Sequence, residues 1–261
     1  MSAIKRISSR DNPFYKSLHK LSSSGRERHA AGQTLLDGPH LLRAFLDSGQ
    51  RPRHLLLNEQ ALQEAEIVAL LGACADVPQT QFDDALFAQL SELKTPNGLL
   101  ALIDIPSAGI QVAHSQLALM LEDIQDPGNL GSILRSAAAA GCDAVFLSSG
   151  CADAWSPRVL RAGMGGHFVL DIVQSADLHK VVAEFAGKIL AASLQAGKSL
   201  YDCNLRGKLA FAIGNEGAGL SATLLEAAHQ HFIIPMPGKV ESLNAAAAAA
   251  VCLFEAVRQR H

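Results

Sequence analysis

Three stretches of this chain place glycine, proline, asparagine and charged residues directly after apolar, strand-like runs. They are DPGNLGSILRSAAAAG (126–141), IGNEGAGLS (213–221) and IPMPGKVESLN (234–244). In open parallel sheets, ligands bind beyond the carboxyl ends of the strands, so loops in this position are candidates for a functional site. Each stretch is also compatible with an ordinary turn that connects a strand to a helix.

The first stretch offers an asparagine and an arginine. Asn129 is placed to cap a helix or to stabilise the loop, and we expect the helix from about Leu130 to Ala140. Arg135 lies inside that helix, and its planar guanidinium suits the gripping of a phosphate. The competing interpretation is a simple connection that carries a surface arginine.

The second stretch contains Gly214, Gly217 and Gly219 within six residues. Such a density of glycine indicates close backbone approach or unusual φ angles. The spacing is not the dinucleotide pattern GxGxxG, and no Walker lysine follows. Because Glu216 would repel a phosphate, a neutral or cationic ligand suits this loop better than a polyphosphate.

The third stretch is stiffened by Pro235 and Pro237, which also remove two backbone donors. A helix is expected to start near Ser242 or Asn244, where free N–H groups could bind a carboxylate or an adenine edge. The six alanines that follow, 245–250, favour helix strongly. A capped C-terminal helix without any ligand remains the alternative.

Other common chemistries lack their signatures. The sequence has no GxSxG elbow, no HExxH pair, and five scattered cysteines without a CxxC spacing. We therefore predict neither a nucleophilic triad, nor a metal site, nor a disulfide framework.

The elements that must position the three stretches alternate between strand and helix. In the second half, strands are expected at 117–123, 143–149, 167–173, 188–194, 208–214 and 231–236. Helical patterns between strands indicate a mostly parallel sheet. The first half shows strands at 34–38, 53–58 and 98–105, with helices beginning at Asp11-Asn12-Pro13 and covering 39–49, 61–75 and 84–93. We predict an α/β domain at 1–106, a linker at 107–115 and a second α/β domain at 116–261.

Composition bounds the function further. The 261 residues are 49% hydrophobic and 18% charged, as in a globular protein. The net charge is −3, but the N-terminal segment is basic, because residues 1–54 hold ten Lys/Arg against four Asp/Glu. This suits an anionic partner, although a solvated basic surface would look the same. The N-terminus has no apolar signal region, and no run long enough to span a membrane occurs, so we expect a cytoplasmic protein.

Taken together and in this order, the three stretches resemble the three motifs of the SpoU/TrmH family of RNA ribose 2′-O-methyltransferases, over about residues 117–261. The segment RERHAAGQTLLDGPHLLRAFLDSG (26–49) resembles the small substrate-binding domain that precedes many such enzymes. The resemblance implies a parallel-sheet α/β/α domain with a deep trefoil knot. It also implies a homodimer and S-adenosylmethionine as methyl donor.

The resemblance also assigns residues. It implies a cofactor pocket formed by Gly214, Glu216, Gly217, Ile234, Met236, Ser242, Leu243 and Asn244. It implies catalytic roles for Arg135, Asn129, Glu216, Ser242 and Asn244, with Arg135 nearest the chemistry. Because arginine stays protonated in proteins, we favour phosphate gripping and hydroxyl orientation over general-base catalysis, which the sequence leaves open.

Two departures from the family pattern stand in the motifs. Ala245 and Ala246 replace a common Val-Ser pair, and Gly128 replaces a bulkier residue. We expect an active enzyme on structured RNA, ribosomal RNA before transfer RNA. A non-catalytic, dimeric RNA-binding protein is the alternative, and an enzyme that methylates a base is a third possibility. We also expect small residues to allow close helix packing against a partner subunit, so that a bulky residue at Ala246 or Ala249 would impair dimerisation or cofactor binding before it impaired helix formation.

Overall fold

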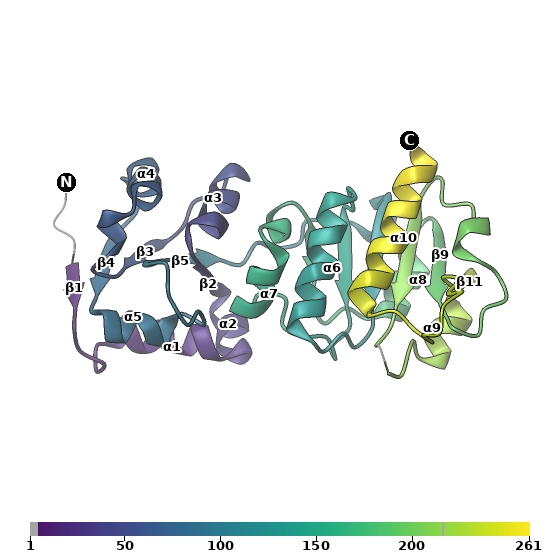
Figure 1. The fold of residues 1–261 in the computed structure, drawn as a ribbon, viewed down its shortest axis with the longest axis horizontal. Helices are drawn as coiled ribbons and strands as arrows, with labels where there is room; N and C mark the ends of the chain where they lie inside the picture. Colours follow the sequence, from purple (N-terminus) through teal and green to yellow (C-terminus); the bar gives the residue numbers. More distant parts are fainter. Residues whose placement is uncertain (1–4, 216) are drawn as a thin grey trace. The chain divides into compact units, whose positions relative to one another are not determined.

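The computed structural model describes residues 5–215 and 217–261, which form two compact units (Figure 1). The first unit combines the chain up to Pro106 with Trp155–Phe168, and the second combines Ser107–Ala154 with Val169–His261. The segment Trp155–Phe168, which the sequence division places in the second domain, thus belongs to the first unit. None of the helices in the described ranges has the length and apolar character needed to cross a lipid bilayer.

The first unit is built on a mixed five-stranded sheet of order β1-β4-β3-β5-β2. Its strands are β1 (Lys5–Ile7), β2 (Gln33–Asp37), β3 (His54–Leu57), β4 (Gln79–Phe82) and β5 (Leu99–Asp104). β5 runs antiparallel to both β2 and β3, whereas β4 runs parallel to β1 and β3. The three strands predicted here are confirmed, and β1 and β4 were not anticipated.

Some helices of the first unit begin where a side chain accepts from their free N–H groups. In α1 (Pro13–Ser23), Asn12 Oδ1 accepts from Phe14 N at 2.9 Å, with Pro13 in the first turn, as predicted. Ser24 caps α2 (Gly25–Ala31) in the same way. The other helices are α3 (Pro39–Asp47), α4 (Ala65–Ala73), α5 (Asp84–Leu90), α7 (Pro157–Gly163), η1 (Ala61–Gln63) and η3 (Gly166–Phe168).

The second unit contains a six-stranded, fully parallel sheet of order β11-β9-β10-β6-β7-β8. The strands are β6 (Leu117–Leu121), β7 (Ala144–Leu147), β8 (Asp171–Val173), β9 (Lys188–Ala192), β10 (Leu209–Ile213) and β11 (Gln230–Phe232). Every residue of β6, β7 and β10 is buried, as parallel strands covered on both faces require. The predicted α/β class with a parallel C-terminal sheet is confirmed.

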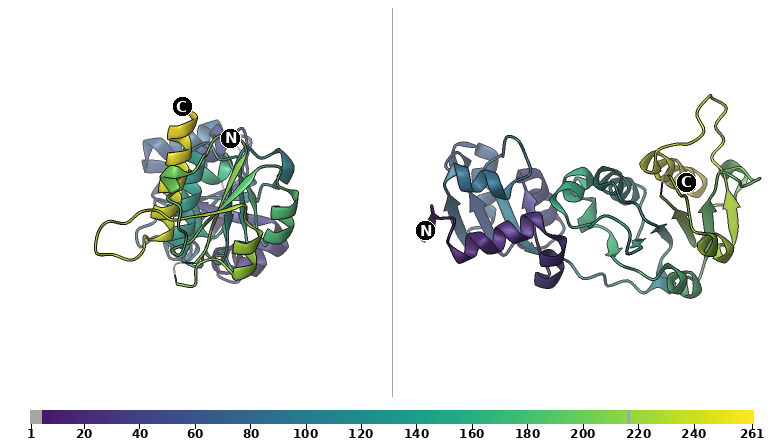
Figure 2. Two further views of the ribbon diagram at one scale, coloured as in Figure 1. Left: turned by 90° about the vertical axis from the view of Figure 1, so that its right-hand side faces the viewer. Right: turned by 90° about the horizontal axis from the view of Figure 1, so that it is seen from below.

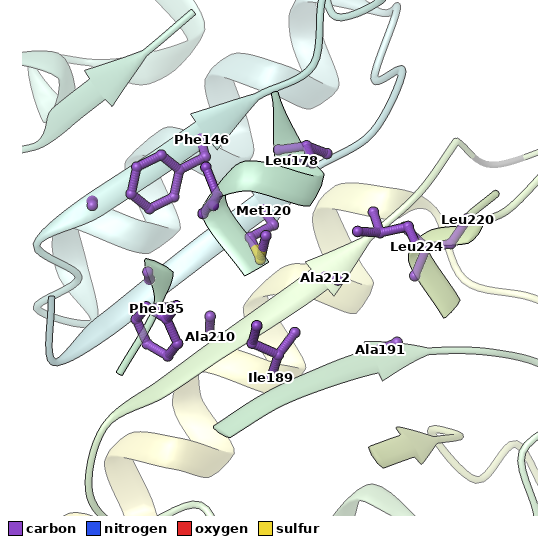
Figure 3. Packing of buried hydrophobic residues seen from close by; sticks show 13 residues of the cluster. Met120, Phe146, Leu178, Phe185, Ile189, Ala191, Ala210, Ala212, Leu220 and Leu224 are labelled. Atoms are coloured by element: carbon purple, nitrogen blue, oxygen red, sulfur yellow. The ribbon is translucent and has the colours of Figure 1, made fainter. Parts of the chain in front are cut away.

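Helices cover both faces of this sheet. Alternate strand residues such as Met120, Phe146 and Ala212 form a buried cluster with residues of α8 (Leu178–Glu184) and α9 (Ala222–Ala227). Figure 3 views this cluster, with the yellow ribbon of α10 behind the strands. On that opposite face, α6 (Pro127–Ala139) packs along α10 (Ala245–Arg260) (Figure 1). Short turns η2 (Val112–His114) and η4 (Leu200–Asp202) complete the unit.

Three predicted boundaries are wrong. The strand expected at 167–173 shrinks to β8, and the strand expected at 231–236 shrinks to β11. Pro235, which has no N–H, cannot donate to a sheet, so pairing ends before it. α6 begins at Pro127 and not at about Leu130, because Asp126, and not Asn129, is the capping residue and its Oδ1 accepts from Asn129 N at 2.7 Å.

Candidate active site

The strand order of the second unit reverses between β6 and β10. The chain proceeds outward from β6 through β7 to β8, then returns to the other side of β6 through β9 and β10. Ligands of parallel α/β sheets bind at such a switch point, beyond the carboxyl ends of the strands. The loops after β6 and β10 start side by side here, since Glu122 N donates to Ile213 O at 3.0 Å. The first two motif loops therefore meet at this edge.

The loop after β10 is a tight turn that two glycines make possible. A Cβ atom on Gly214 would lie 2.2 Å from the backbone carbonyl of Gly219, so the two segments touch only because Gly214 has no side chain. Gly219 has a φ of +71°, in the left-handed region that favours glycine. Gly217 meets neither constraint. Two of the three motif glycines are thus required by backbone geometry.

Asn215 holds this turn in place. Its Oδ1 accepts from Gly217 N at 2.8 Å and from Ala218 N at 3.2 Å. Its Nδ2 donates to the carbonyl oxygen of Asp123 at 3.0 Å, in the loop after β6. Sequence reasoning did not single out Asn215, although an asparagine between glycines is a recognised signal for a side-chain-stabilised turn.

The loop after β6 is fixed in turn to the loop after β7. Asp123 has a positive φ of 56°. A residue other than glycine keeps such a φ only where its surroundings hold it there. Its backbone N–H donates to Ser148 Oγ at 2.9 Å, and Ser148 Oγ donates to Asp123 Oδ1 at 2.8 Å. The first motif loop is therefore held on one side by Ser148 and on the other by Asn215.

The third motif loop joins β11 to α10 and extends away from the sheet in both views of Figure 2. Asn244, one of the two predicted starting points, caps α10 and accepts from Ala246 N at 2.9 Å and Ala247 N at 3.3 Å. Its amide nitrogen donates to Asn129 Oδ1 at 2.8 Å. The asparagines of the first and third motifs, 115 positions apart, are thus in direct contact.

A cavity of about 380 Å³ opens at the carboxyl ends of β9, β10 and β11. Six of the eight residues predicted to bind a cofactor line it: Gly214, Gly217, Ile234, Met236, Ser242 and Leu243. Ala245 and Ala248 of α10 form part of its wall. Asn244 is not a lining residue, but it directly follows Leu243 and fixes the start of α10.

The remaining candidates lie elsewhere. Arg135 is exposed on α6, does not line the cavity, and forms no hydrogen bond or ion pair with the residues that the structure describes. Glu216 lies outside the described residues. Within the described ranges, no three His, Cys, Asp or Glu side chains are grouped so that they could hold a metal ion.

Sequence reasoning missed one wall of the cavity. Ser193, Leu194 and Gln195, in the loop after β9, line it together with the motif loops. Their only signal is position, because this loop also follows the carboxyl end of a parallel strand. Of these residues, Gln195 has an exposed side chain whose amide makes no hydrogen bond within the described chain.

Comparison with known proteins agrees with this geometry. Residues 116–254 match the SpoU rRNA Methylase family, and residues 12–101 match the MRM3-like substrate binding domain. The 23S rRNA (guanosine(2553)-2′-O)-methyltransferase RlmP of Bacillus subtilis is 31% identical, over 96% of this chain and 98% of its own length.

Solved structures extend the likeness to the whole fold. A crystal structure of an RNA 2′-O ribose methyltransferase superposes with a TM-score of 0.82 at 32% identity, covering 97% of this chain and 98% of the other. An AdoMet-bound rRNA methyltransferase from Sinorhizobium meliloti gives a TM-score of 0.83 at 26% identity and covers 98% of both chains. This chain belongs to the SpoU rRNA methylase family.

Proposed function

We propose that this protein transfers a methyl group from S-adenosylmethionine to a ribose 2′-hydroxyl of ribosomal RNA. The observation that carries the proposal is the cavity at the ends of β9, β10 and β11, lined by two motif loops and bordered by the Asn129–Asn244 contact. The names of the similar proteins, which include 23S rRNA and 2′-O-ribose methylation, support the same reaction.

The residues present fit S-adenosylmethionine. None of the described residues that line the cavity is Lys or Arg, so nothing there attracts a polyphosphate or repels a sulfonium cation. Ile213, Leu220 and Ile234 supply apolar walls, and Gly214 brings backbone groups to the surface of the cavity. We infer that Ser193, Gln195 and Ser242 provide the polar side-chain contacts.

When bound, S-adenosylmethionine supplies an electrophilic methyl group. The protein then has to place the ribose hydroxyl in line with that group, since positioning accounts for much of the rate of a displacement. We infer that Asn129, held by Asn244, shapes the first motif loop where the ribose must lie. Arg135, exposed and without a partner in the described chain, binds the RNA phosphate and orients the hydroxyl. Catalytic roles for Glu216 and Ser242 remain part of the proposal.

We further propose that the protein is a homodimer that acts in the cytoplasm. Support for the dimer is Phe254, which is 49% exposed in the middle of α10. Support for the location is the B. subtilis relative, whose name gives 23S rRNA as its substrate.

The proposal includes the trefoil knot that the family resemblance implies. Its support is the close approach of the two loops that would cross. Ile233 N donates to Lys198 O at 2.9 Å, and Leu200 N donates to Ile233 O at 2.8 Å. The segment after β11 therefore runs against the segment after β9 before the chain enters α10.

Two measurements test the function. Calorimetric titration with S-adenosylmethionine should give saturable binding, and incubation with radiolabelled cofactor and ribosomal RNA should give a ribose-methylated nucleotide after nuclease digestion and mass spectrometry. Absence of saturable heat would favour the alternative, a non-catalytic RNA-binding protein. A methylated base in the digest would show that the reaction type is wrong.

A further inference from the structure

A groove of about 450 Å³ lies in the first unit, between α1, α2 and the strands β2 and β5. We call it the α1 groove. The residues that matter below are Phe14, Lys16 and Lys20 of α1, Glu27 of α2, Gln33 of β2 and Leu102 of β5. Its volume is in the range of pockets that hold one small organic ligand.

Two lysines form its cationic side. Lys16 and Lys20 are four residues apart on α1 and therefore lie on one face of the helix. Lys16 Nζ lies 2.8 Å from Asp11 Oδ1, but both side chains are well exposed, so this ion pair is weak and easily exchanged. Lys20 forms no hydrogen bond or ion pair with the described residues. The groove can thus present two ammonium groups to an anion.

The interior of the groove suits a flat ring. Leu18, Leu21 and Leu102 are buried and form an apolar floor. The half-buried ring of Phe14 lines the groove and lies 4.8 Å, between ring centroids, from His54. Unstacked RNA bases bind to surfaces of this kind, through their faces on aromatic rings.

Polar groups within the groove could read the edge of such a ring. Glu27 is half-buried, and its carboxylate makes no hydrogen bond or ion pair with the described residues. Gln33 Nε2 donates to Asp104 Oδ1 at 3.1 Å, which leaves Gln33 Oε1 available. The negative charge of Glu27 also disfavours a polyphosphate inside the groove, so a phosphate would stay beside the lysines.

We propose that the α1 groove binds one unpaired nucleotide of the RNA substrate. The phosphate contacts Lys16 and Lys20, and the base lies against Phe14 with its edge toward Glu27. A base-paired nucleotide cannot do this, because its base faces are covered by its neighbours. This inference rests on the proposed function, in which RNA is the substrate.

The test uses the full chain and a short fluorescein-labelled single-stranded RNA of mixed sequence, with binding followed by fluorescence anisotropy. Lys16→Gln combined with Lys20→Gln should reduce the slope of log affinity against log salt by about 0.7, since the two lysines together neutralise one phosphate and each single-strand phosphate contributes about 0.7. The matched control, Arg43→Gln with Lys94→Gln, removes two exposed cations of the same unit outside the groove and should leave the slope unchanged.

A second variant probes the base without changing charge. Phe14→Leu removes the aromatic face but keeps an apolar side chain, and it should weaken single-strand binding about tenfold, the size of a lost stacking contact. The affinity for the same sequence as a duplex should change little in both groove variants.

Equal losses in the groove and control variants would overturn the proposal, as would a larger loss for duplex than for single-stranded RNA. The proposed function is judged separately, on the unmodified protein. If that protein methylates ribosomal RNA while the groove variants bind RNA normally, only the groove assignment fails. If it binds no S-adenosylmethionine, the enzymatic function fails whatever the groove does.

Discussion

Gly214 and Gly217 belong to the same motif but differ in what surrounds them. A methyl group on Gly214 would meet the Gly219 backbone at 2.2 Å, whereas one on Gly217 would meet only Asn215 Oδ1, at 3.4 Å. Gly214→Ala should therefore lower the free energy of unfolding by about 1–3 kcal/mol and weaken S-adenosylmethionine binding at least tenfold. Gly217→Ala should change stability by less than about 0.5 kcal/mol. Calorimetry and denaturant titration of both variants check this, and similar effects would contradict it.

Arg135 is separated from the cavity, and this has a consequence for its role. Because it does not line the cavity, Arg135→Ala should abolish methyl transfer while it leaves the S-adenosylmethionine dissociation constant within about twofold. Arg135→Lys keeps the charge but loses the bidentate fork, so it should retain only a small part of the rate. Single-turnover methylation and calorimetry measure the two quantities independently. A collapse of cofactor affinity in Arg135→Ala would place this residue in the pocket and not at the RNA.

At the level of elements, one alanine of the α10 run packs inside the chain. Ala249 is fully buried within this one chain, so it does not itself face a partner subunit, whereas Ala246 is half-buried and its part of the prediction stays untested. Because α10 packs closely on α6, a small residue is needed at position 249 for internal packing. Ala249→Leu should destabilise the protein by about 1–3 kcal/mol. Ala247→Leu, at an exposed position of the same helix, is the control and should be neutral in urea titration.

Glu255 makes the stability of α10 depend on pH. Its side chain accepts from Arg258 Nε and Nη2, both at 2.8 Å, and from Gln259 Nε2 at 2.8 Å. Hydrogen bonding to Arg258 is the main cause that lowers the pKa of Glu255 to about 2, with Gln259 adding to it. A lowered folded-state pKa stabilises the protein above the ordinary value near 4.5, and this stabilisation is lost as the pH falls toward 2.

The expected result is a steeper loss of stability in the natural sequence than in Glu255→Gln between about pH 4.5 and pH 2. The difference should be on the order of 1 kcal/mol, because Arg258 is solvent-exposed and screening weakens the pair. Urea unfolding at several pH values measures it. Glu184→Gln, which removes the exposed partner of Lys180 on α8, should leave the profile unaltered.

The more completely an element is buried, the more plainly the sequence predicted it. β6, β7 and β10 are apolar along their whole length, and the sequence shows them plainly. β1 and β4, with the sequences KRI and QTQF, are short and polar, and they form strands only because neighbouring strands pair with them. α7 was not predicted because its seven residues are too few to show a clear helical repeat of apolar positions.

The residues of the candidate site also divide into those that the sequence predicts and those whose role is visible only in the folded chain. The family resemblance pointed to Ser242 and Leu243, which line the cavity, and local loop chemistry placed the start of the last helix near Ser242 or Asn244. The roles of Asn215 and Asp126 depend on which backbone N–H groups come within reach of each side chain, and that is visible only in three dimensions. The Asn129–Asn244 contact joins distant segments, so no local pattern could have predicted it.

At the level of the whole molecule, the proposed homodimer depends on how the exposed apolar residue of α10 is covered. Phe254 is 49% exposed although Leu253 and Glu255 beside it are buried. Burial of a phenylalanine ring contributes about 1.5–3 kcal/mol, so Phe254→Asp should raise the dimer dissociation constant at least tenfold. Leu62→Asp alters a residue of similar exposure, 50%, in the first unit and should leave association intact. Sedimentation equilibrium of the three proteins measures the constants directly. If Phe254→Asp associates as tightly as the natural sequence, α10 is not the interface, and if the natural sequence is a monomer, the dimer proposal itself is wrong.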